Sequence, residues 1–225
     1  MRINALIFPA MTQLDFTGPY EVFGSLPDTE VRVVAPTLEP VVAGHGLRFL
    51  PDVALADAPP CDLLFVPGGA GVSAMMQDRV VLEWLRDQAG GARYVTSVCT
   101  GALVLGAAGL LKGYRATTHW LSLDLLAEFG AIPEKDRVVT DRNRITGGGV
   151  TAGIDFALTV AADVYGSETA RGIQLMLEYD PAPPFRGGHP DRAEPALVTA
   201  MRRKRAGLQS RRLEEVRRVA AWYCG

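Results

Sequence analysis

Residues 94–101 read Tyr-Val-Thr-Ser-Val-Cys-Thr-Gly, and they are the clearest indication of the fold. Its first five residues form an apolar run of strand length. Cys99 comes next, and the small residues that follow it belong to a segment that we predict to be a helix over 100–111. A residue at such a strand-to-helix turn is held exposed at the end of a sheet, as in a nucleophile elbow. The stretch therefore predicts an α/β fold with a reactive cysteine at Cys99.

Strand-like apolar runs alternate with helix-like segments along most of the chain. We predict strands over 4–8, 31–35, 63–66, 94–98, 138–140 and 144–147, a hairpin within 41–55, and helices over 15–25, 79–90, 100–111, 121–129 and 152–165, followed by one that Ser167 caps and prolines 181, 183 and 184 end. Such alternation implies a mostly parallel sheet with helices on both faces, as in a flavodoxin-like three-layer sandwich. We predict one α/β domain over residues 1–185, with residues 186–225 as a C-terminal helical extension of the same domain.

The composition is that of a globular protein with a sizeable core. Of the 225 residues, 48% are hydrophobic and 21% are charged, and the net charge is −2. A net negative charge argues against nucleic acid as the main partner, because phosphate binding needs a basic surface. No apolar run reaches the roughly 20 residues of a membrane span, and the N-terminal segment is too short for a signal peptide. These features predict a cytoplasmic protein that binds neither nucleic acid nor membranes.

A basic stretch over 195–222 has helical spacing and stands apart from this composition. It contains the arginine-rich runs 202–205 and 211–212. One interpretation is a nucleic-acid-binding tail, and the other is a solvated helix packed on the body or on a second subunit. Glu214 and Glu215 interleave with the arginines and the rest of the chain is acidic, so we favour the packed helix.

Three segments that can carry chemistry follow predicted strands, namely Gln13–Pro19, Pro67–Gly69 and Val98–Gly101. In open parallel sheets, ligands bind at the carboxyl ends of the strands. We therefore expect these segments to meet at one edge of the sheet. Asp15 is either the N-cap of a helix or an acid/base group. Its position suits a cap, and only its expected approach to Cys99 favours the second role.

Cys99 is the candidate nucleophile among three cysteines. The N-terminus of the following helix favours a thiolate over a thiol. A thiol pKa of about 8.5 leaves only about 3% ionised at pH 7, and a drop of about two pH units would make thiolate the main form. The alternative is a buried structural cysteine. We expect Cys61, beside Asp62, and Cys224, at the terminus, to be inert.

Gly68 and Gly69 allow the backbone to turn its N–H groups toward a ligand, as an oxyanion site needs. A competing pattern is the match of residues 69–74 to G-x-G-x-x-A, a dinucleotide fingerprint. The strand before it is not the first of the fold, and Glu83 and Asp87 lie in a helix instead of ending the next strand. We therefore predict no nucleotide cofactor.

Histidine is scarce, with three in the chain. Thr100 follows Cys99, so the adjacent Cys-His pair that would supply a base for proteolysis is missing. His119, in Ala116-Thr-Thr-His-Trp120, is a possible base for Cys99 or a structural histidine, and we favour the structural role. No cluster of side chains has metal-ligand spacing, so we predict no metal.

Six motifs carry a resemblance to a known family. They are Gln13-Leu-Asp-Phe-Thr-Gly-Pro19, Val66-Pro-Gly-Gly69, Val95-Thr-Ser-Val-Cys-Thr-Gly101, Ala116-Thr-Thr-His-Trp120, Thr146-Gly-Gly-Gly-Val-Thr-Ala-Gly-Ile-Asp155 and Glu178-Tyr-Asp-Pro-Ala-Pro-Pro-Phe185. Over nearly its whole length the chain resembles the PfpI-like branch of the class I glutamine amidotransferase superfamily, and within it the bacterial isocyanide hydratases. The cysteine elbow and Pro-Gly-Gly are specific for the fold, whereas Asp15 with Cys99 and Thr100 is the narrower signal.

The resemblance implies a set of site residues and a quaternary state. The implied site has Cys99 as nucleophile, Asp15 as acid/base group, Thr100 as their support, and Gly68, Gly69 and Val150 around the substrate, with the Gly69 backbone stabilising developing charge. Members of this branch are usually homodimers without a cofactor, and the C-terminal extension would help to build the dimer. Val150 is a departure, since isoleucine stands there in relatives, and it bears on packing near the cysteine.

The implied reaction is the hydration of a small-molecule isocyanide, R–N≡C, to an N-formamide through a cysteine thioimidate. Two alternatives stay open. One is a glyoxalase- or deglycase-like enzyme acting on methylglyoxal, although such relatives place a glutamate and a histidine where this chain has Asp15 and Thr100. The other is a non-enzymatic ligand-sensing domain resembling those of AraC-type regulators. The 40-odd residues after Phe185 are too few for the helix-turn-helix module of such regulators.

Overall fold

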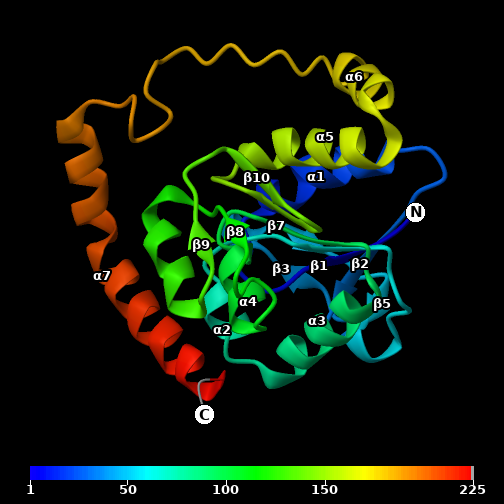
Figure 1. Cartoon of the computed structure of the whole chain (residues 1–225), viewed down its shortest axis with the longest axis horizontal. Coiled ribbons are helices and arrows are strands. Elements are labelled where there is room, and N and C mark those ends of the chain that lie inside the picture. The colour runs from blue at the N-terminus through cyan, green and yellow to red at the C-terminus, as the bar shows by residue number, and fades with distance from the viewer. Residues whose placement is uncertain (224–225) are drawn as a thin grey trace.

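A seven-stranded sheet forms the centre of the computed structural model, which describes residues 1–223 (Figure 1). Its strands are β1 (Arg2–Leu6), β2 (Glu30–Ala35), β5 (Val53–Ala54), β6 (Leu63–Val66), β7 (Tyr94–Val98), β10 (Val138–Asp141) and β11 (Arg144–Gly147). The strand order is β10-β11-β7-β6-β1-β2-β5, and only the pair of β10 with β11 is antiparallel. The predicted mostly parallel sheet is confirmed.

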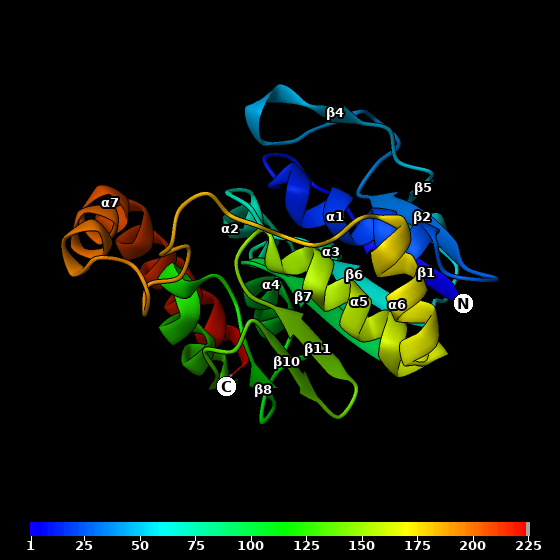
Figure 2. The ribbon, with the colours of Figure 1, turned by 90° about the horizontal axis from the view of Figure 1, so that it is seen from above.

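Helices cover both faces of this sheet (Figures 1 and 2). On one face α1 (Gln13–Gly24) packs against α5 (Ala152–Tyr165), which also contacts α6 (Ser167–Met176). On the other face lie α3 (Arg79–Gly91) and α4 (Gly101–Ala107), which pack against each other. The three layers are those of the predicted flavodoxin-like sandwich.

Three aromatic rings join the first helical layer to the sheet. Phe65 of β6 lies against Phe23 of α1 and Phe156 of α5, with ring centroids 5.7 and 5.8 Å apart. All three side chains are fully buried. Strands covered on both faces are apolar throughout, and Leu63–Val66 shows this pattern. These contacts fix α1, which carries Asp15, over the centre of the sheet.

The remaining elements are short. They are β3 (Val41–Val42), η1 (Gly44–Gly46), β4 (Arg48–Phe49), η2 (Leu55–Asp57), α2 (Val72–Met75), β8 (Arg115–Ala116), η3 (Trp120–Phe129), β9 (Ile132–Pro133) and η4 (Ala221–Tyr223), where η denotes a 3-10 helix. The hairpin expected within 41–55 is confined to β3 and β4. The rest of that segment includes β5, which joins the main sheet parallel to β2.

Three predicted helices differ from the structure. The helix expected over 100–111 ends at Ala107, because Gly109 adopts φ +76°. Ser167 is not a cap, since Gly166 holds the N-cap position of α6, and the helix ends well before Pro181. The segment expected as an amphipathic helix over 121–129 is the 3-10 helix η3. Burial recurs there at three-residue intervals, as at Ser122 and Leu125, and a 3-10 helix places such residues on one face.

The basic stretch near the C-terminus forms the long helix α7 (Pro195–Ala220), drawn in orange and red in Figure 1. It packs against η3 and α4. Its buried residues Arg212, Val216 and Val219 recur at spacings of four and three, so they share one helix face. The packed-helix interpretation is confirmed. Among residues 1–223, none of the helices combines the length and the apolar character that a membrane span needs.

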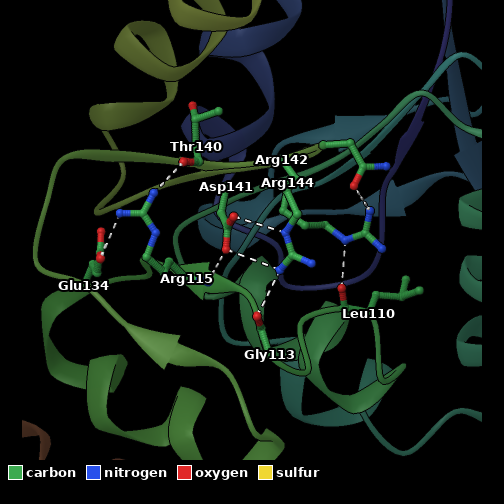
Figure 3. Close-up of polar contacts among 9 residues, drawn as sticks. Leu110, Gly113, Arg115, Glu134, Thr140, Asp141, Arg142 and Arg144 are labelled. Atoms are coloured by element: carbon green, nitrogen blue, oxygen red, sulfur yellow. Dashed lines mark hydrogen bonds and ion pairs between the residues drawn. The ribbon is translucent and has the colours of Figure 1, made fainter.

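A cluster of arginines ties the end of α4 to the β10–β11 hairpin (Figure 3). Arg144 is buried, and its Nε donates to the carbonyl of Leu110 at 2.8 Å. Arg142 donates to the carbonyl of Gly113 at 2.9 Å and lies over the Tyr114 ring at 3.5 Å from its centroid. Carbonyls left free after a helix need such donors. The cluster therefore fixes β11 and α4 relative to each other at the amino end of β11.

Candidate active site

Cys99 occupies a tight turn between β7 and α4. Its φ of +54° lies in the left-handed region, which is uncommon for a residue other than glycine. Its N–H donates to the carbonyls of Gly147 at 3.0 Å and Gly148 at 2.8 Å. Its own carbonyl accepts a 2.6 Å hydrogen bond from the Thr118 hydroxyl. Backbone strain held by surrounding bonds is typical of functional sites, and the predicted elbow is present.

Two glycines bring the neighbouring backbones close to this turn. A Cβ atom on Gly101 would lie 2.2 Å from the Val66 carbonyl oxygen. On Gly68 it would lie 2.5 Å from the Thr100 nitrogen and 2.8 Å from Asp15 Oδ2. Real Cβ atoms do not approach so closely, so these positions require glycine. The Pro-Gly-Gly turn therefore presses directly against the cysteine turn.

Asp15 lies in the first turn of α1 and is fully buried. Thr12 holds the N-cap position of that helix, so the N-cap interpretation of Asp15 is wrong. Its Oδ2 accepts a 3.1 Å hydrogen bond from the N–H of Gly68. Oδ1 has no hydrogen-bond partner within residues 1–223 by ordinary geometry, and the carboxyl lies beside the Cys99 thiol. The segments Gln13–Pro19, Pro67–Gly69 and Val98–Gly101 therefore meet at one edge of the sheet, as predicted.

Thr100 links the cysteine turn to Gly69. The N–H of Gly69 donates to the Thr100 hydroxyl at 3.0 Å, and that hydroxyl is 3.3 Å from the Gly69 carbonyl, to which it donates. The N–H of Gly68 is already held by Asp15. Both N–H groups that were expected to face a ligand are thus bonded within the protein. In this geometry they orient Asp15 and Thr100.

Burial controls the protonation of the pair. It raises the pKa of Asp15 to about 7, while contact with Cys99 and the N–H of Gly68 act in the opposite direction. Burial also raises the pKa of the Cys99 thiol, and the charge and contact of Asp15 add to this effect. The expected lowering of the thiol pKa is not found, because the side chain is only 5% exposed and α4 is short. The thiol therefore keeps its proton at neutral pH until a base removes it.

His119 has a structural contact. Its Nδ1 accepts a hydrogen bond of 3.3 Å from the N–H of Leu121, at the start of η3. Burial lowers its pKa, and the nearby charges of Arg212 and Arg205 lower it further. The ring is therefore neutral at pH 7, which agrees with the structural role that we favoured.

A cavity of about 670 Å³ opens beside the cysteine turn. Its walls include Thr118 and Gly148, two of the residues that bond the backbone of Cys99. Val150, which is half-buried, and His119 also line it. Pockets of this size suit small molecules.

Comparison with known proteins agrees with this architecture. The profile of the DJ-1/PfpI family matches residues 1–163. The chain belongs to the DJ-1/PfpI family. It is 54% identical to the isonitrile hydratase of Pseudomonas putida, over 98% of this chain and 97% of that protein. The predicted family relationship and fold are both confirmed.

Two further relatives are informative. A crystal structure of a THiJ/PfpI family protein from Pseudomonas syringae has a TM-score of 0.92 and 44% identity, covering 97% of this chain and 90% of that one. The glutathione-independent glyoxalase DJR-1.2 of Caenorhabditis elegans is 31% identical over 70% of this chain and 83% of that protein.

Other expectations for this family member concern cysteines and bound groups. Cys61 is buried, and burial raises its pKa to about 11, which agrees with an inert thiol. Cys224 lies outside the described residues. Within the described part of the chain, no three His, Cys, Asp or Glu side chains are grouped so that they could hold a metal. The dinucleotide-like segment 69–74 overlaps α2, which has four residues and is too short for such a site.

The sequence prediction missed Thr118 and the Gly147–Gly148 carbonyls, which hold the backbone of Cys99. Both signals were present, because Thr118 stands in the Thr-Thr-His-Trp motif and the glycines end a predicted strand. It also missed Arg212, which is buried near the site. Its spacing to Val216 and Val219 places it on the packed face of α7, and that periodicity was the available signal.

Proposed function

We propose that this protein is an isocyanide hydratase, a cysteine-dependent hydro-lyase that adds water to R–N≡C and releases an N-formamide. The observation that carries this function is the 54% identity, over 98% of the chain, to an isonitrile hydratase. Isonitrile and isocyanide are two names for the same functional group. The buried contact of Asp15 with Cys99 supplies a nucleophile and an acid/base group without histidine.

The first half of the reaction uses the raised pKa values of this pair. The sulfur of Cys99 adds to the terminal carbon of the isocyanide, while Asp15 accepts the thiol proton and donates it to that same carbon. The product is a thioimidate, R–N=CH–S–Cys99, which contains every atom of the thiol and the isocyanide. A carboxyl with a pKa of about 7 can both accept and donate a proton at neutral pH.

In the second half, water attacks the thioimidate carbon. Asp15 accepts a proton from this water and donates it to the substrate nitrogen. The resulting carbon bears a hydroxyl and the sulfur. It collapses to the formamide R–NH–CHO, the C–S bond breaks, and the hydroxyl proton returns to the Asp15–Cys99 pair. Water is thus consumed and the enzyme is regenerated.

The remaining site residues act on geometry. Gly68 holds the Asp15 carboxylate through its N–H, and Gly69 holds the Thr100 hydroxyl in the same way. We assign these two N–H groups to orienting the pair instead of to binding an oxyanion. Val150 lines the cavity that would receive the substituent R.

Three further predictions from sequence belong to this proposal. We infer a homodimer, because members of the branch that this chain resembles are usually homodimers. We also infer a cytoplasmic location. The third is that residues 186–225 form one domain with residues 1–185, which is supported by the packing of α7 on η3 and α4.

The experiment that tests the function is conversion of an aryl isocyanide to its formamide by the purified protein. The Cys99→Ala variant should lose this activity, and Cys61→Ala, which removes the other cysteine found in the core, should keep it. Methylglyoxal is the competing substrate, because a glyoxalase is 31% identical to this chain. Robust methylglyoxal turnover without formamide production would contradict the assignment. A regulator would show neither activity, and after Phe185 the described residues form only α7 and η4.

A further inference from the structure

Arg212 of α7 is a buried cation with little local compensation. Its side chain is only 5% exposed. Its Nη1 donates to the Ser122 hydroxyl at 3.3 Å, and its Nε has no hydrogen-bond partner within residues 1–223. No carboxylate of that part of the chain lies within ion-pair distance of the guanidinium. A buried charge without a partner is costly, and arginine cannot escape the cost by losing its proton.

The position of Arg212 connects it with the cysteine turn. The helix that carries it packs against α4, which begins just after Cys99, and against η3. Ser122 of η3 donates its backbone N–H to the His119 carbonyl at 2.8 Å. Thr118 directly precedes His119, and its hydroxyl donates to the carbonyl of Cys99. A continuous set of packed groups therefore runs from α7 to the nucleophile.

Electrostatic interactions also connect Arg212 with Cys99. Burial lowers the pKa of the guanidinium, and its attraction to the ionised form of Cys99 and to Glu215 opposes that effect. His119 faces it from the start of η3 and is kept neutral partly by its charge. Cys99 in turn faces Asp15 from α1, whose carboxylate opposes an anionic sulfur. Arg212 is therefore a nearby charge of the sign that favours an anionic sulfur, whereas Asp15 has the opposite sign.

We propose that Arg212 is a positioning residue of the Cys99 site, through which the C-terminal helix supplies a buried positive charge that stabilises the anionic sulfur. Negative charge forms on sulfur twice in the proposed reaction, during attack on the isocyanide and when the C–S bond breaks. The role rests on the proposed function of Cys99 as the nucleophile. It gives the C-terminal extension a part in the chemistry beyond packing.

The test measures the reactivity of Cys99 itself against pH. The full-length protein is alkylated with iodoacetamide across a pH range, and the modified Cys99 peptide is quantified by mass spectrometry, which separates it from other cysteines. Arg212→Met removes the charge and keeps most of the volume, whereas Arg212→Lys keeps the charge. Arg211→Met is the matched control, because Arg211 is the adjacent, exposed arginine of the same helix.

We expect Arg212→Met to raise the midpoint of alkylation by about 0.5 pH units or more and to slow alkylation at neutral pH about threefold. Arg212→Lys should recover part of this loss, and Arg211→Met should match the wild type. A structural role alone would change the melting temperature and leave the midpoint unaltered. A folded Arg212→Met protein with the midpoint of Arg211→Met would overturn the proposal.

A second variant, Glu215→Gln, tests the role of Arg212 even if the Arg212→Met protein does not fold. Glu215 carries a charge that partly offsets Arg212, so Glu215→Gln should expose Cys99 to more of the positive field. We expect the midpoint to move in the opposite direction, downward. An unchanged or raised midpoint in Glu215→Gln counts against the proposal. Because alkylation needs no isocyanide, a failure of the proposed hydration activity would be visible separately, in the formamide assay.

Discussion

The two ends of strands β7 and β11 differ in how completely their buried polar groups are hydrogen-bonded. At the amino end, where Arg144 pairs with Val95, the buried guanidinium bonds the Leu110 carbonyl and the Asn143 side chain, both at 2.8 Å. The carboxyl end, by contrast, buries Asp15 and Arg212 with Oδ1 and Nε lacking ordinary partners.

Satisfied buried groups stabilise a fold, whereas unsatisfied ones cost stability and persist where they are used. One end of these strands thus serves the fold and the other serves the chemistry. Substitutions at the two ends should therefore separate activity from stability.

The largest expected effect is on activity at the carboxyl end. Asp15→Asn keeps the shape and the oxygen that accepts the Gly68 N–H, but it removes the proton-transfer group. We expect the rate of isocyanide hydration to fall at least about 100-fold, as is typical when a general acid/base is lost. Steady-state formamide production measures it. A variant with more than about a tenth of the wild-type rate would not fit this role.

The same substitution should show the cost of the buried carboxyl. Asp15 has a raised pKa of about 7 in the folded protein, against 3.8 ordinarily. Between these values the folded state holds a proton that the unfolded state has released, so stability falls as pH rises from about 4 to about 7. Asp15→Asn lacks this loss and should be more stable than the wild type at pH 8 by about 2–4 kcal/mol.

Urea unfolding at pH 4 and at pH 8 checks this expectation. The two proteins should differ little in stability at the lower pH, where Asp15 is protonated in the folded state and about half ionised in the unfolded state. A stability difference between the wild type and Asp15→Asn that is the same at both pH values would contradict this expectation. It would mean that burial does not keep the Asp15 carboxyl protonated.

At the amino end, Arg144→Met should change stability and spare activity. It leaves the buried Leu110 carbonyl without its donor, and we expect a loss of about 2–3 kcal/mol in the free energy of unfolding. Isocyanide turnover of the folded variant should stay within about twofold of the wild type. Arg171→Met, at an exposed position of α6, is the matched control for removal of an arginine. A large loss of turnover in the folded Arg144→Met protein would mean that the two ends are not separate.

The smallest effect should come from Ser122→Ala. This change removes the hydrogen bond that Arg212 donates to the Ser122 hydroxyl and the one that this hydroxyl donates to Gln209, both at 3.3 Å, but leaves the charge in place. We expect a stability change of about 1 kcal/mol or less and little change in the alkylation midpoint of Cys99. A midpoint shift as large as that of Arg212→Met would show that the bond, instead of the charge, matters.

Sequence patterns predicted the layers of the fold and the meeting of Asp15, Gly68 and Cys99, because strand–helix alternation determines which chain ends share a sheet edge. They could not show where the N–H groups of Gly68 and Gly69 point, since that depends on the side chains of Asp15 and Thr100 in three dimensions.

The direction of the Cys99 pKa shift also depends on three-dimensional burial. The helix N-terminus was visible in the sequence, but the 5% exposure of the side chain and its contact with Asp15 were not. Arg212 was hidden differently, because it stands beside Arg211 in a run that looks solvated. Only the periodicity of α7 distinguishes the two arginines.

The positive φ of Cys99 has a consequence for how this position tolerates change. The cost of a left-handed backbone is borne by any side chain with a Cβ atom, so cysteine, serine and alanine are strained alike there. Glycine alone would relax the turn. At position 99, the substitution most favourable to the backbone, Cys99→Gly, also removes the reactive sulfur. Selection for stability and selection for activity therefore oppose each other at this one codon.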